Sequence, residues 1–281
     1  MNHISSKFIV SDLDGTLLDH PKYLSKEYVK DLNELMDKGL KFTIATGRDM
    51  KKTLKAIPGL NLPYPCILTN GALLADLKSQ EFLKITNIIP EVIDEILNLS
   101  REFNIPPMVF ASFDPILKNV TFNKGTWGTK GIKPLESENY IPYKEHDVVS
   151  IQFHTTKDLL DPFKEMIYRK FKNDTNLIYI EDVAYNALGY EGDWYWLEIN
   201  SHDAGKAQML RYLTQSLNIS MEDVIAFGDN HNDIGMLKAA GTGIAMENSP
   251  DEVKVIADFI APSNIDGGVI TYLKDNIDEL L

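Results

Sequence analysis

The chain has 281 residues, 44% of them hydrophobic and 25% charged, which is typical of a folded globular protein and excludes collagen-like, disulfide-scaffold and wholly disordered chains. Its 41 acidic and 28 basic residues give a formal net charge of −13, which argues against broad binding to nucleic acid or to anionic membranes. A small anionic substrate remains compatible with this charge, because one metal ion or one lysine can reverse the sign locally.

The single cysteine and the first residues of the chain indicate a compartment. Cys66 lies in the apolar run 65–68 and has no second cysteine to pair with, so we expect a buried thiol in a reducing environment. Residues 1–7 lack the apolar core of a signal peptide, and no stretch approaches membrane-spanning length. We therefore expect a soluble cytoplasmic protein.

Residues 1–80 alternate short apolar runs with amphipathic patterns of helical period. A helix is predicted to begin near Ser25, a favoured N-cap residue, and to end at Gly39, a common helix-stop residue. A second helix is predicted at about 50–57. Strands are predicted at 8–10, 42–45 and 67–69.

The same alternation resumes late in the chain, where apolar runs of strand length again separate helical patterns. Strands are predicted at 197–199, 224–227 and 243–246, and helices at 206–217, at 233–240 and after Ser249-Pro250. Repeated strand–helix units of this kind are typical of an α/β fold with a parallel sheet.

The middle of the chain has a different pattern, with two helices predicted at 90–103 and 159–171 and aromatic-rich strand candidates such as 148–153. The length of the chain exceeds that of most single domains. We therefore predict an α+β domain at 81–195 inserted into an α/β core formed by 1–80 and 196–281.

The run Asp12-Leu13-Asp14-Gly15-Thr16 directly follows the first predicted strand. Ligands of open parallel sheets bind at the carboxyl ends of the strands, where two carboxylates two residues apart can both face one ion or one phosphorus atom. The alternative is an acidic turn, since Asp and Gly are common turn residues. A calcium loop is excluded, because it requires an acidic residue or Asn at position 16 and Gly at position 17.

A second polar cluster, Gly228-Asp229-Asn230-His231-Asn232-Asp233, follows a later apolar strand. Oxygen donors from two separate loops are the ligands that Mg²⁺ prefers. The same residues also suit a helix N-cap, and the two roles are compatible. His231 is expected to be a solvent-exposed loop residue and not a ligand.

Two further segments lie at the same predicted edge of the sheet and are weak signals when judged alone. Thr46-Gly47 would offer a hydroxyl and a backbone N–H to a phosphate at a helix start, or could simply form a turn. Lys206 opens a predicted helix, as many surface lysines do.

Together these four motifs, in this order, resemble those of the haloacid dehalogenase superfamily of aspartate-nucleophile phosphotransferases. In finer detail, the sequence resembles the Cof-type subfamily IIB of this superfamily. The segments that carry this similarity are Ala45-Thr46-Gly47-Arg48, Thr69-Asn70-Gly71-Ala72, 228–237, 245–250 and 264–269. The resemblance implies a Rossmann-like parallel sheet core with an inserted α+β cap domain that determines substrate specificity.

The resemblance also implies roles for individual residues. Asp12 would be the nucleophile, and Asp14 would protonate the leaving group and then activate water. Asp233 would orient Lys206. Mg²⁺ would be held by the side chains of Asp12 and Asp229 and the backbone carbonyl of Asp14. The groups implied to bind the phosphoryl oxygens are Thr46, Lys206, Asn232 and the backbone N–H groups of Leu13 and Gly47.

These residues predict a Mg²⁺-dependent phosphatase acting on small phosphorylated metabolites, such as sugar phosphates or phosphorylated cofactors. Two alternatives stay open: a phosphomutase-like phosphotransferase, and a non-catalytic protein that binds phosphate esters on the same scaffold. Substrate-contact candidates in the cap are Trp127, His154, Tyr185 and Trp194, each of which could instead serve packing. The substrate itself and the oligomeric state are left open by the sequence.

Overall fold

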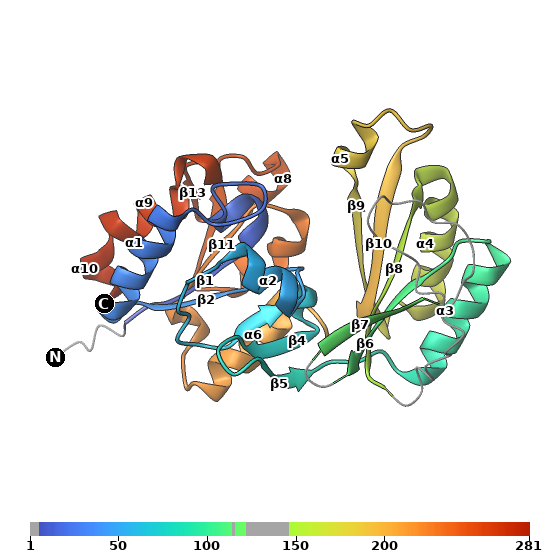
Figure 1. Cartoon of the computed structure of the whole chain (residues 1–281), viewed down its shortest axis with the longest axis horizontal. Coiled ribbons are helices and arrows are strands. Elements are labelled where there is room, and N and C mark those ends of the chain that lie inside the picture. The colour runs from blue at the N-terminus through green and yellow to red at the C-terminus, as the bar shows by residue number, and fades with distance from the viewer. Residues whose placement is uncertain (1–5, 114–115, 122–145) are drawn as a thin grey trace. The chain divides into compact units, whose positions relative to one another are not determined.

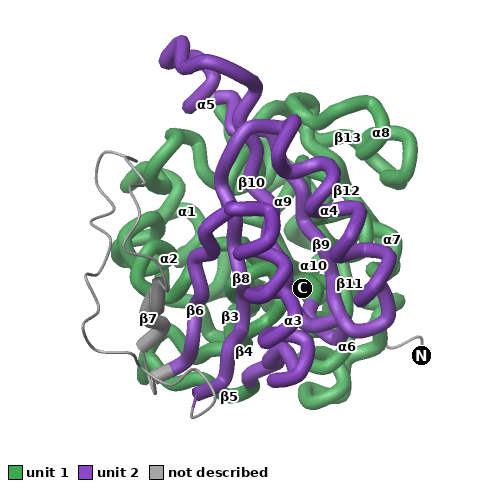
Figure 2. Tube along the Cα trace, turned by 90° about the vertical axis from the view of Figure 1, so that its right-hand side faces the viewer, with its two compact units in different colours: residues 1–84, 205–281 green, residues 85–204 purple. Residues whose placement is uncertain are grey.

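A computed structural model describes residues 6–113, 116–121 and 146–281 of the chain (Figure 1). The chain divides into two compact units (Figure 2). Unit 1 comprises Met1–Lys84 and Gly205–Leu281, and unit 2 comprises Ile85–Ala204. No helix among the described residues is both long and apolar enough to cross a membrane.

Unit 1 is built on a five-stranded sheet in which every neighbouring pair of strands is parallel, in the order β13-β12-β11-β1-β2. The strands are β1 (Phe8–Ser11), β2 (Lys41–Ile44), β11 (Val224–Gly228), β12 (Thr242–Met246) and β13 (Phe259–Ala261). A separate small sheet contains β3 (Cys66–Leu68), β4 (Leu73–Asp76) and β5 (Glu81–Ile85). One parallel bridge, between Ala45 and Ile67, links the two sheets.

Helices cover both faces of the parallel sheet (Figure 1). They are α1 (Lys26–Asp37), α2 (Met50–Ala56), α6 (Lys206–Ser216), α7 (Ile234–Ala239), α8 (Asp251–Lys254), α9 (Gly268–Asp275) and α10 (Ile277–Leu280). Ala226 of β11 packs in the same apolar cluster as Met209 of α6, whereas the next residue, Phe227, contacts Tyr272 of α9. This alternation explains why the sequences of the inner strands β1 and β11 are almost continuously apolar: these strands are buried on both faces, whereas Phe259 and Ile260 of the edge strand β13 are exposed.

Helix α1 shows how local sequence sets an element of this core. The Ser25 side chain accepts a hydrogen bond from the backbone N–H of Tyr28, which caps the first turn as predicted. Apolar residues at helical spacing are buried against the core, among them Leu32 and Leu35. Gly39, at φ +109°, follows the last turn and takes a backbone conformation that other residues rarely adopt.

Unit 2 is an antiparallel sheet in the order β7-β6-β8-β10-β9, packed against helices. Its elements are α3 (Pro90–Glu102), β6 (Met108–Phe113), β7 (Ile116–Thr121), β8 (Val148–Thr156), α4 (Lys157–Phe171), β9 (Thr175–Glu181), α5 (Val183–Asn186) and β10 (Trp194–Ser201). One apolar cluster joins Ile96 of α3 and Phe163 of α4 to Phe153 and Leu197 of the sheet.

The strand predicted at 197–199 was assigned to the wrong sheet. It is part of β10, which pairs antiparallel with β8 and β9 inside unit 2 and not with the parallel strands of unit 1. Its alternating apolar residues, Leu197 and Ile199, signal a half-buried strand but carry no information about the partner strand. The chain passes from unit 1 to unit 2 after Lys84 and returns to unit 1 after Ala204, whereas the expected boundaries were at 80 and 195.

Three of the four aromatic residues singled out in the middle of the chain contact one another. His154, which is buried, lies 5.0 Å from Tyr185 and 5.1 Å from Trp194, ring centre to ring centre. It stacks at 4.2 Å on Trp196, whose indole N–H donates to Asp182. Burial lowers the pKa of the His154 imidazole, and the Asp182 carboxylate opposes that effect. The fourth residue, Trp127, lies outside the described residues.

Gly71 closes a turn where two backbones meet. It has φ +93°, and a Cβ placed on it would lie 2.2 Å from the backbone carbon and oxygen of Gly205, the residue that directly precedes α6. We predict that Gly71→Ala lowers the free energy of unfolding by ~1–2 kcal/mol for the positive φ and by a further ~1–3 kcal/mol for the overlap. Urea unfolding followed by circular dichroism measures the loss.

The matched control for Gly71→Ala is Gly189→Ala. Gly189 has a similar φ of +77°, but a Cβ there would meet no atom within 4 Å. Gly189→Ala should therefore lower the free energy of unfolding only by the ~1–2 kcal/mol that the positive φ costs. Equal losses in the two variants would contradict the close approach of Gly71 to Gly205.

The single cysteine is expected to be inert in the folded protein. Cys66 lies fully buried in β3, where burial raises the pKa of its thiol to about 12. At pH 8 we predict that a thiol-specific disulfide reagent labels the native protein at least ~100-fold more slowly than the urea-unfolded chain, because labelling requires opening. Rapid labelling of one thiol per native chain would contradict the burial.

Candidate active site

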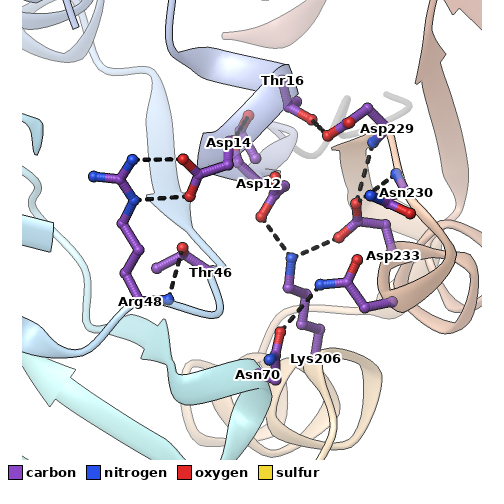
Figure 3. A network of polar contacts seen from close by, with 12 residues as sticks. Asp12, Asp14, Thr16, Thr46, Arg48, Asn70, Lys206, Asp229, Asn230 and Asp233 are labelled. Atoms are coloured by element: carbon purple, nitrogen blue, oxygen red, sulfur yellow. Dashed lines mark hydrogen bonds and ion pairs between the residues drawn. The ribbon is translucent and has the colours of Figure 1, made fainter. Parts of the chain in front are cut away.

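The four polar motifs come together at the carboxyl edge of the parallel sheet in unit 1 (Figure 3). Asp12 follows β1, Thr46 follows β2, and the cluster ending at Asp233 follows β11. Lys206 is the first residue of α6. The backbone N–H of Asp12 donates to the carbonyl of Phe227 at 2.9 Å, which ties the first of these loops to the end of β11.

The Lys206 ammonium lies between two carboxylates. Its Nζ is 2.5 Å from Oδ1 of Asp12 and 2.6 Å from Oδ1 of Asp233. All three residues are buried, with exposed fractions of 3%, 5% and 0%. A charged group so far from solvent is stable only when paired, and Lys206 is paired on both sides. The burial and the pairing together show that Lys206 is not an ordinary surface lysine.

Asp233 uses both carboxylate oxygens. Oδ1 accepts from Lys206, and Oδ2 accepts from the backbone N–H groups of Asp229 and Asn230 at 3.1 and 3.0 Å. With the Asn230 side chain, these bonds form a capping box at the short turn η5 (His231–Asp233). The predicted cap is therefore present and also fixes the carboxylate that faces Lys206. His231 is exposed, as expected.

Asp229 is held against the turn that follows β1. The Thr16 hydroxyl donates to Oδ1 of Asp229 at 2.7 Å. A Cβ at Gly15, which has φ +78°, would lie only 2.3 Å from Oδ2 of Asp229. Glycine therefore permits both the turn and the close approach of the Asp229 carboxylate.

Three carboxylates have the spacing of a cation site. One oxygen each of Asp12, Asp229 and Asp233 can be chosen so that all lie within 4.8 Å of one another. Since Asp233 is fully engaged, the free donors are Oδ2 of Asp12 and Oδ2 of Asp229, neither of which receives a hydrogen bond within the described part of the chain. Hard oxygen donors of this kind fit a divalent cation such as Mg²⁺.

The charges of the cluster are unbalanced. Burial raises the pKa of the Asp12 carboxyl well above its usual range, opposed by Lys206 and reinforced by the negative charges of Asp233 and Asp229. Burial likewise raises the pKa of Asp229 to about 6. Burial lowers the pKa of Lys206, but the two carboxylates beside it outweigh this, and the net shift is upward. Three carboxylates against one ammonium leave an excess of negative charge that a bound cation would offset.

Thr46 and Gly47 form a turn at the end of β2 that faces this cluster (Figure 3). The Thr46 hydroxyl oxygen accepts from the backbone N–H of Arg48 at 3.1 Å, so its own hydrogen can donate elsewhere. A Cβ at Gly47 would lie 3.0 Å from the Asn70 amide nitrogen. The small residue therefore leaves room for a neighbouring loop.

That neighbouring loop is the turn η2 (Thr69–Gly71), whose three residues all have positive φ, from +49° to +93°. Such a conformation is unfavourable for Thr69, and backbone strain of this kind is concentrated at functional sites. Two bonds hold the turn: the N–H of Thr69 donates to the Arg48 carbonyl, and the N–H of Asn70 donates to the Thr46 carbonyl, both at 3.0 Å. The amide oxygen of Asn70 also accepts from Asn232 at 3.1 Å.

Asp14 lies apart from the buried cluster. Its side chain is half exposed, at 53%, and both its oxygens accept from Arg48: Oδ2 from Nε at 2.8 Å and Oδ1 from Nη2 at 2.5 Å. The structure thus brings together the side chains of Asp12, Lys206, Asp229 and Asp233 but directs that of Asp14 toward Arg48.

Three residues of the site had no predicted role. They are Thr16, Arg48 and Asn70, which stood in the sequence only as parts of motifs. Each acts through a partner far away in sequence, for example Thr16 through Asp229 and Asn70 through Asn232. A sequence pattern indicates which residues lie in a loop but not which loops become neighbours, so these pairs could not be predicted from it.

Comparison with known proteins supports the resemblance. A family model described as haloacid dehalogenase-like hydrolase matches residues 9–273. The chain is 28% identical to the 5-amino-6-(5-phospho-D-ribitylamino)uracil phosphatase YcsE of Bacillus subtilis, with 96% of each chain covered. It is 30% identical to a B. subtilis phosphatase of the same name, YwtE, with 98% covered. It is 24% identical to the pyridoxal phosphate phosphatase YbhA of Escherichia coli, covering 98% of this chain and 100% of that one.

Solved structures agree on the fold. BT1666 of Bacteroides thetaiotaomicron, described as a phosphatase of the haloalkanoate (HAD) enzyme superfamily, superposes with a TM-score of 0.74 at 21% identity, covering 98% of this chain and 96% of that one. These findings confirm the predicted α/β fold, a parallel core sheet with a separate antiparallel region, and the resemblance read from the motifs. The chain belongs to the haloacid dehalogenase-like hydrolase family and is a phosphatase of its Cof type.

Proposed function

We propose that the protein hydrolyses phosphate monoesters of small metabolites, with Mg²⁺ as cofactor and Asp12 as the residue that is transiently phosphorylated. One observation carries the proposal: the buried Lys206 ammonium holds one oxygen of Asp12 and leaves the other without a partner among the described residues. A carboxylate fixed in this way, beside a positive charge, is suited to attack a phosphorus atom.

The cation would be held by Asp12 and Asp229 through their side chains and by Asp14 through its backbone carbonyl. When bound, it would neutralise the excess negative charge and let an anionic phosphate approach an anionic nucleophile. The oxygen-only donor set supports Mg²⁺ over softer metals.

In the first step, the Asp12 oxygen forms a bond to phosphorus while the bond from phosphorus to the ester oxygen breaks. The departing alkoxide takes a proton from Asp14 and leaves as an alcohol. In the second step, water gives its proton to Asp14 and attacks phosphorus, which releases phosphate and restores the Asp12 carboxylate. Asp14 ends the cycle in the protonation state in which it began.

The phosphoryl oxygens need donors around them during both steps. Lys206, kept in place by Asp233, supplies the buried positive charge of the site. The Thr46 hydroxyl and the Asn232 amide, which keeps a second N–H beyond its bond to Asn70, supply neutral donors. The backbone N–H groups of Leu13 and Gly47 would be further donors to the phosphoryl oxygens.

The substrate class rests on the relatives. They include phosphatases named for a phosphorylated ribitylaminouracil and for pyridoxal phosphate, both small phosphorylated metabolites. We infer that this chain acts on the same broad class, with residues 81–195 as the cap that selects the leaving group. Hydrolysis is favoured over phosphoryl transfer to a second sugar because the relatives compared above are phosphatases by name.

The proposal predicts metal-dependent turnover that needs Asp12. With Mg²⁺, the wild-type protein should release phosphate from para-nitrophenyl phosphate and from members of a panel of sugar phosphates, nucleotides and pyridoxal phosphate. EDTA or Asp12→Asn should lower kcat by at least ~10³-fold, because the nucleophile or its activation is lost. Acid-quenched wild-type enzyme should carry phosphate on Asp12.

The control for Asp12→Asn is Asp37→Asn, the same change on the exposed end of α1. It should retain full activity. Failure of the folded, Mg²⁺-loaded wild type to hydrolyse any ester would overturn the proposal and favour the ester-binding alternative. Transfer to a second sugar in place of phosphate release would favour the mutase.

Cation binding should also stabilise the fold. At ~100-fold excess over its Kd, Mg²⁺ should add ~2.7 kcal/mol to the free energy of unfolding, since it binds only the folded site. Asp229→Asn, which can still accept from Thr16, should lose most of this gain. Thermal unfolding with and without Mg²⁺ measures the effect. Asp251→Asn, an exposed position at the start of α8, should keep the gain, and an equal gain in Asp229→Asn would argue against the assigned site.

A further inference from the structure

The contact between Arg48 and Asp14 has no role in the reaction proposed above. The Arg48 guanidinium presents two parallel N–H groups to the two oxygens of Asp14, at 2.5 and 2.8 Å (Figure 3). The two side chains differ in burial: that of Arg48 is 19% exposed and that of Asp14 is 53% exposed. The arginine is therefore the enclosed partner, and the carboxylate is the one open to a ligand.

Arg48 stands on a fixed backbone. Its N–H donates to the Thr46 hydroxyl oxygen at 3.1 Å, and its carbonyl accepts from the N–H of Thr69 at 3.0 Å. These bonds tie Arg48 to its own turn after β2 and to the neighbouring turn η2. The Asp14 carboxylate depends on this contact, because Arg48 is the only hydrogen-bond partner of its side chain among the described residues.

We propose that Arg48 is a positioning residue for the proton transfers: its guanidinium fixes the orientation of the Asp14 carboxyl group, so that one oxygen exchanges a proton with the ester oxygen and then with water while the other stays bound to Arg48. This inference rests on the proposed function, in which Asp14 gives a proton to the leaving group and takes one from water. Arg48 itself does not touch the reacting atoms.

Arginine suits this task better than lysine. A planar guanidinium that binds a carboxylate at two points fixes both its position and its orientation. An ammonium is a point charge around which the carboxylate can rotate. Orientation matters because a displacement of about 1 Å at a catalytic group can cost ~10²-fold in rate.

The experiment compares two esters through kcat/KM, which reports the steps up to the irreversible loss of the leaving group. Para-nitrophenolate leaves without a proton, whereas an alkoxide needs one. The alkyl ester is the best substrate from the panel above. Variants Arg48→Met, Arg48→Lys, Asp14→Asn and the double variant Arg48→Met/Asp14→Asn are measured on both esters.

If Arg48 acts through Asp14, the losses fall on the alkyl ester. Asp14→Asn should lower its kcat/KM by ~10²–10⁴-fold, and Arg48→Met by ~10–100-fold. On para-nitrophenyl phosphate both variants should stay within about 3-fold of wild type. Arg48→Lys should lie between Arg48→Met and wild type on the alkyl ester. The double variant should match Asp14→Asn within about 2-fold, because the two residues work as a unit.

The control is Arg169→Met, which removes another arginine paired with a carboxylate, here Glu165 on the surface at 2.8 Å. It should leave both esters unchanged. An equal loss on both esters in Arg48→Met, or a further loss in the double variant beyond Asp14→Asn, would show that Arg48 binds the phosphate and would overturn the inference alone. Absence of wild-type turnover on every ester would overturn the proposed function, and the inference with it.

Discussion

The buried ion pairs of Lys206 are the interaction on which the site depends. Lys206 is only 3% exposed, so its charge must be neutralised locally, and its two partners, Asp12 and Asp233, come from different strand ends. Removing either carboxylate would leave the charge half compensated in a poorly solvated place. The same pairing that makes this arrangement costly to disturb also holds Asp12 in one orientation, as its proposed role as nucleophile requires.

Close contacts at two glycines make that convergence possible. Gly71 lets η2 approach Gly205 at the start of α6, and Gly15 lets the turn after β1 approach Asp229. Each contact has room for a hydrogen atom but not for a side chain. The two glycines therefore allow these segments to approach one another closely, and Thr69, whose positive φ is unfavourable, lies in the same turn as Gly71.

The excess negative charge of the site indicates that it would bind a cation. Asp12 and Asp229 each keep a carboxylate oxygen without a partner in the described residues, and burial raises the pKa of both groups. Carboxylates in that situation are stabilised by a cation. The cation and Lys206 together would explain how a protein with a net charge of −13 can accept an anionic ester.

The sequence by itself determined the parallel core, the order of the motifs and the identity of the acidic and basic residues at the strand ends, because apolar periodicity and strand-end position are local properties. Only the tertiary structure decided which groups pair. It directed Asp14 to Arg48 and Asn232 to Asn70, and it placed the strand through Leu197 in the antiparallel sheet. Such pairings depend on which distant segments become neighbours, and a local sequence pattern does not determine this.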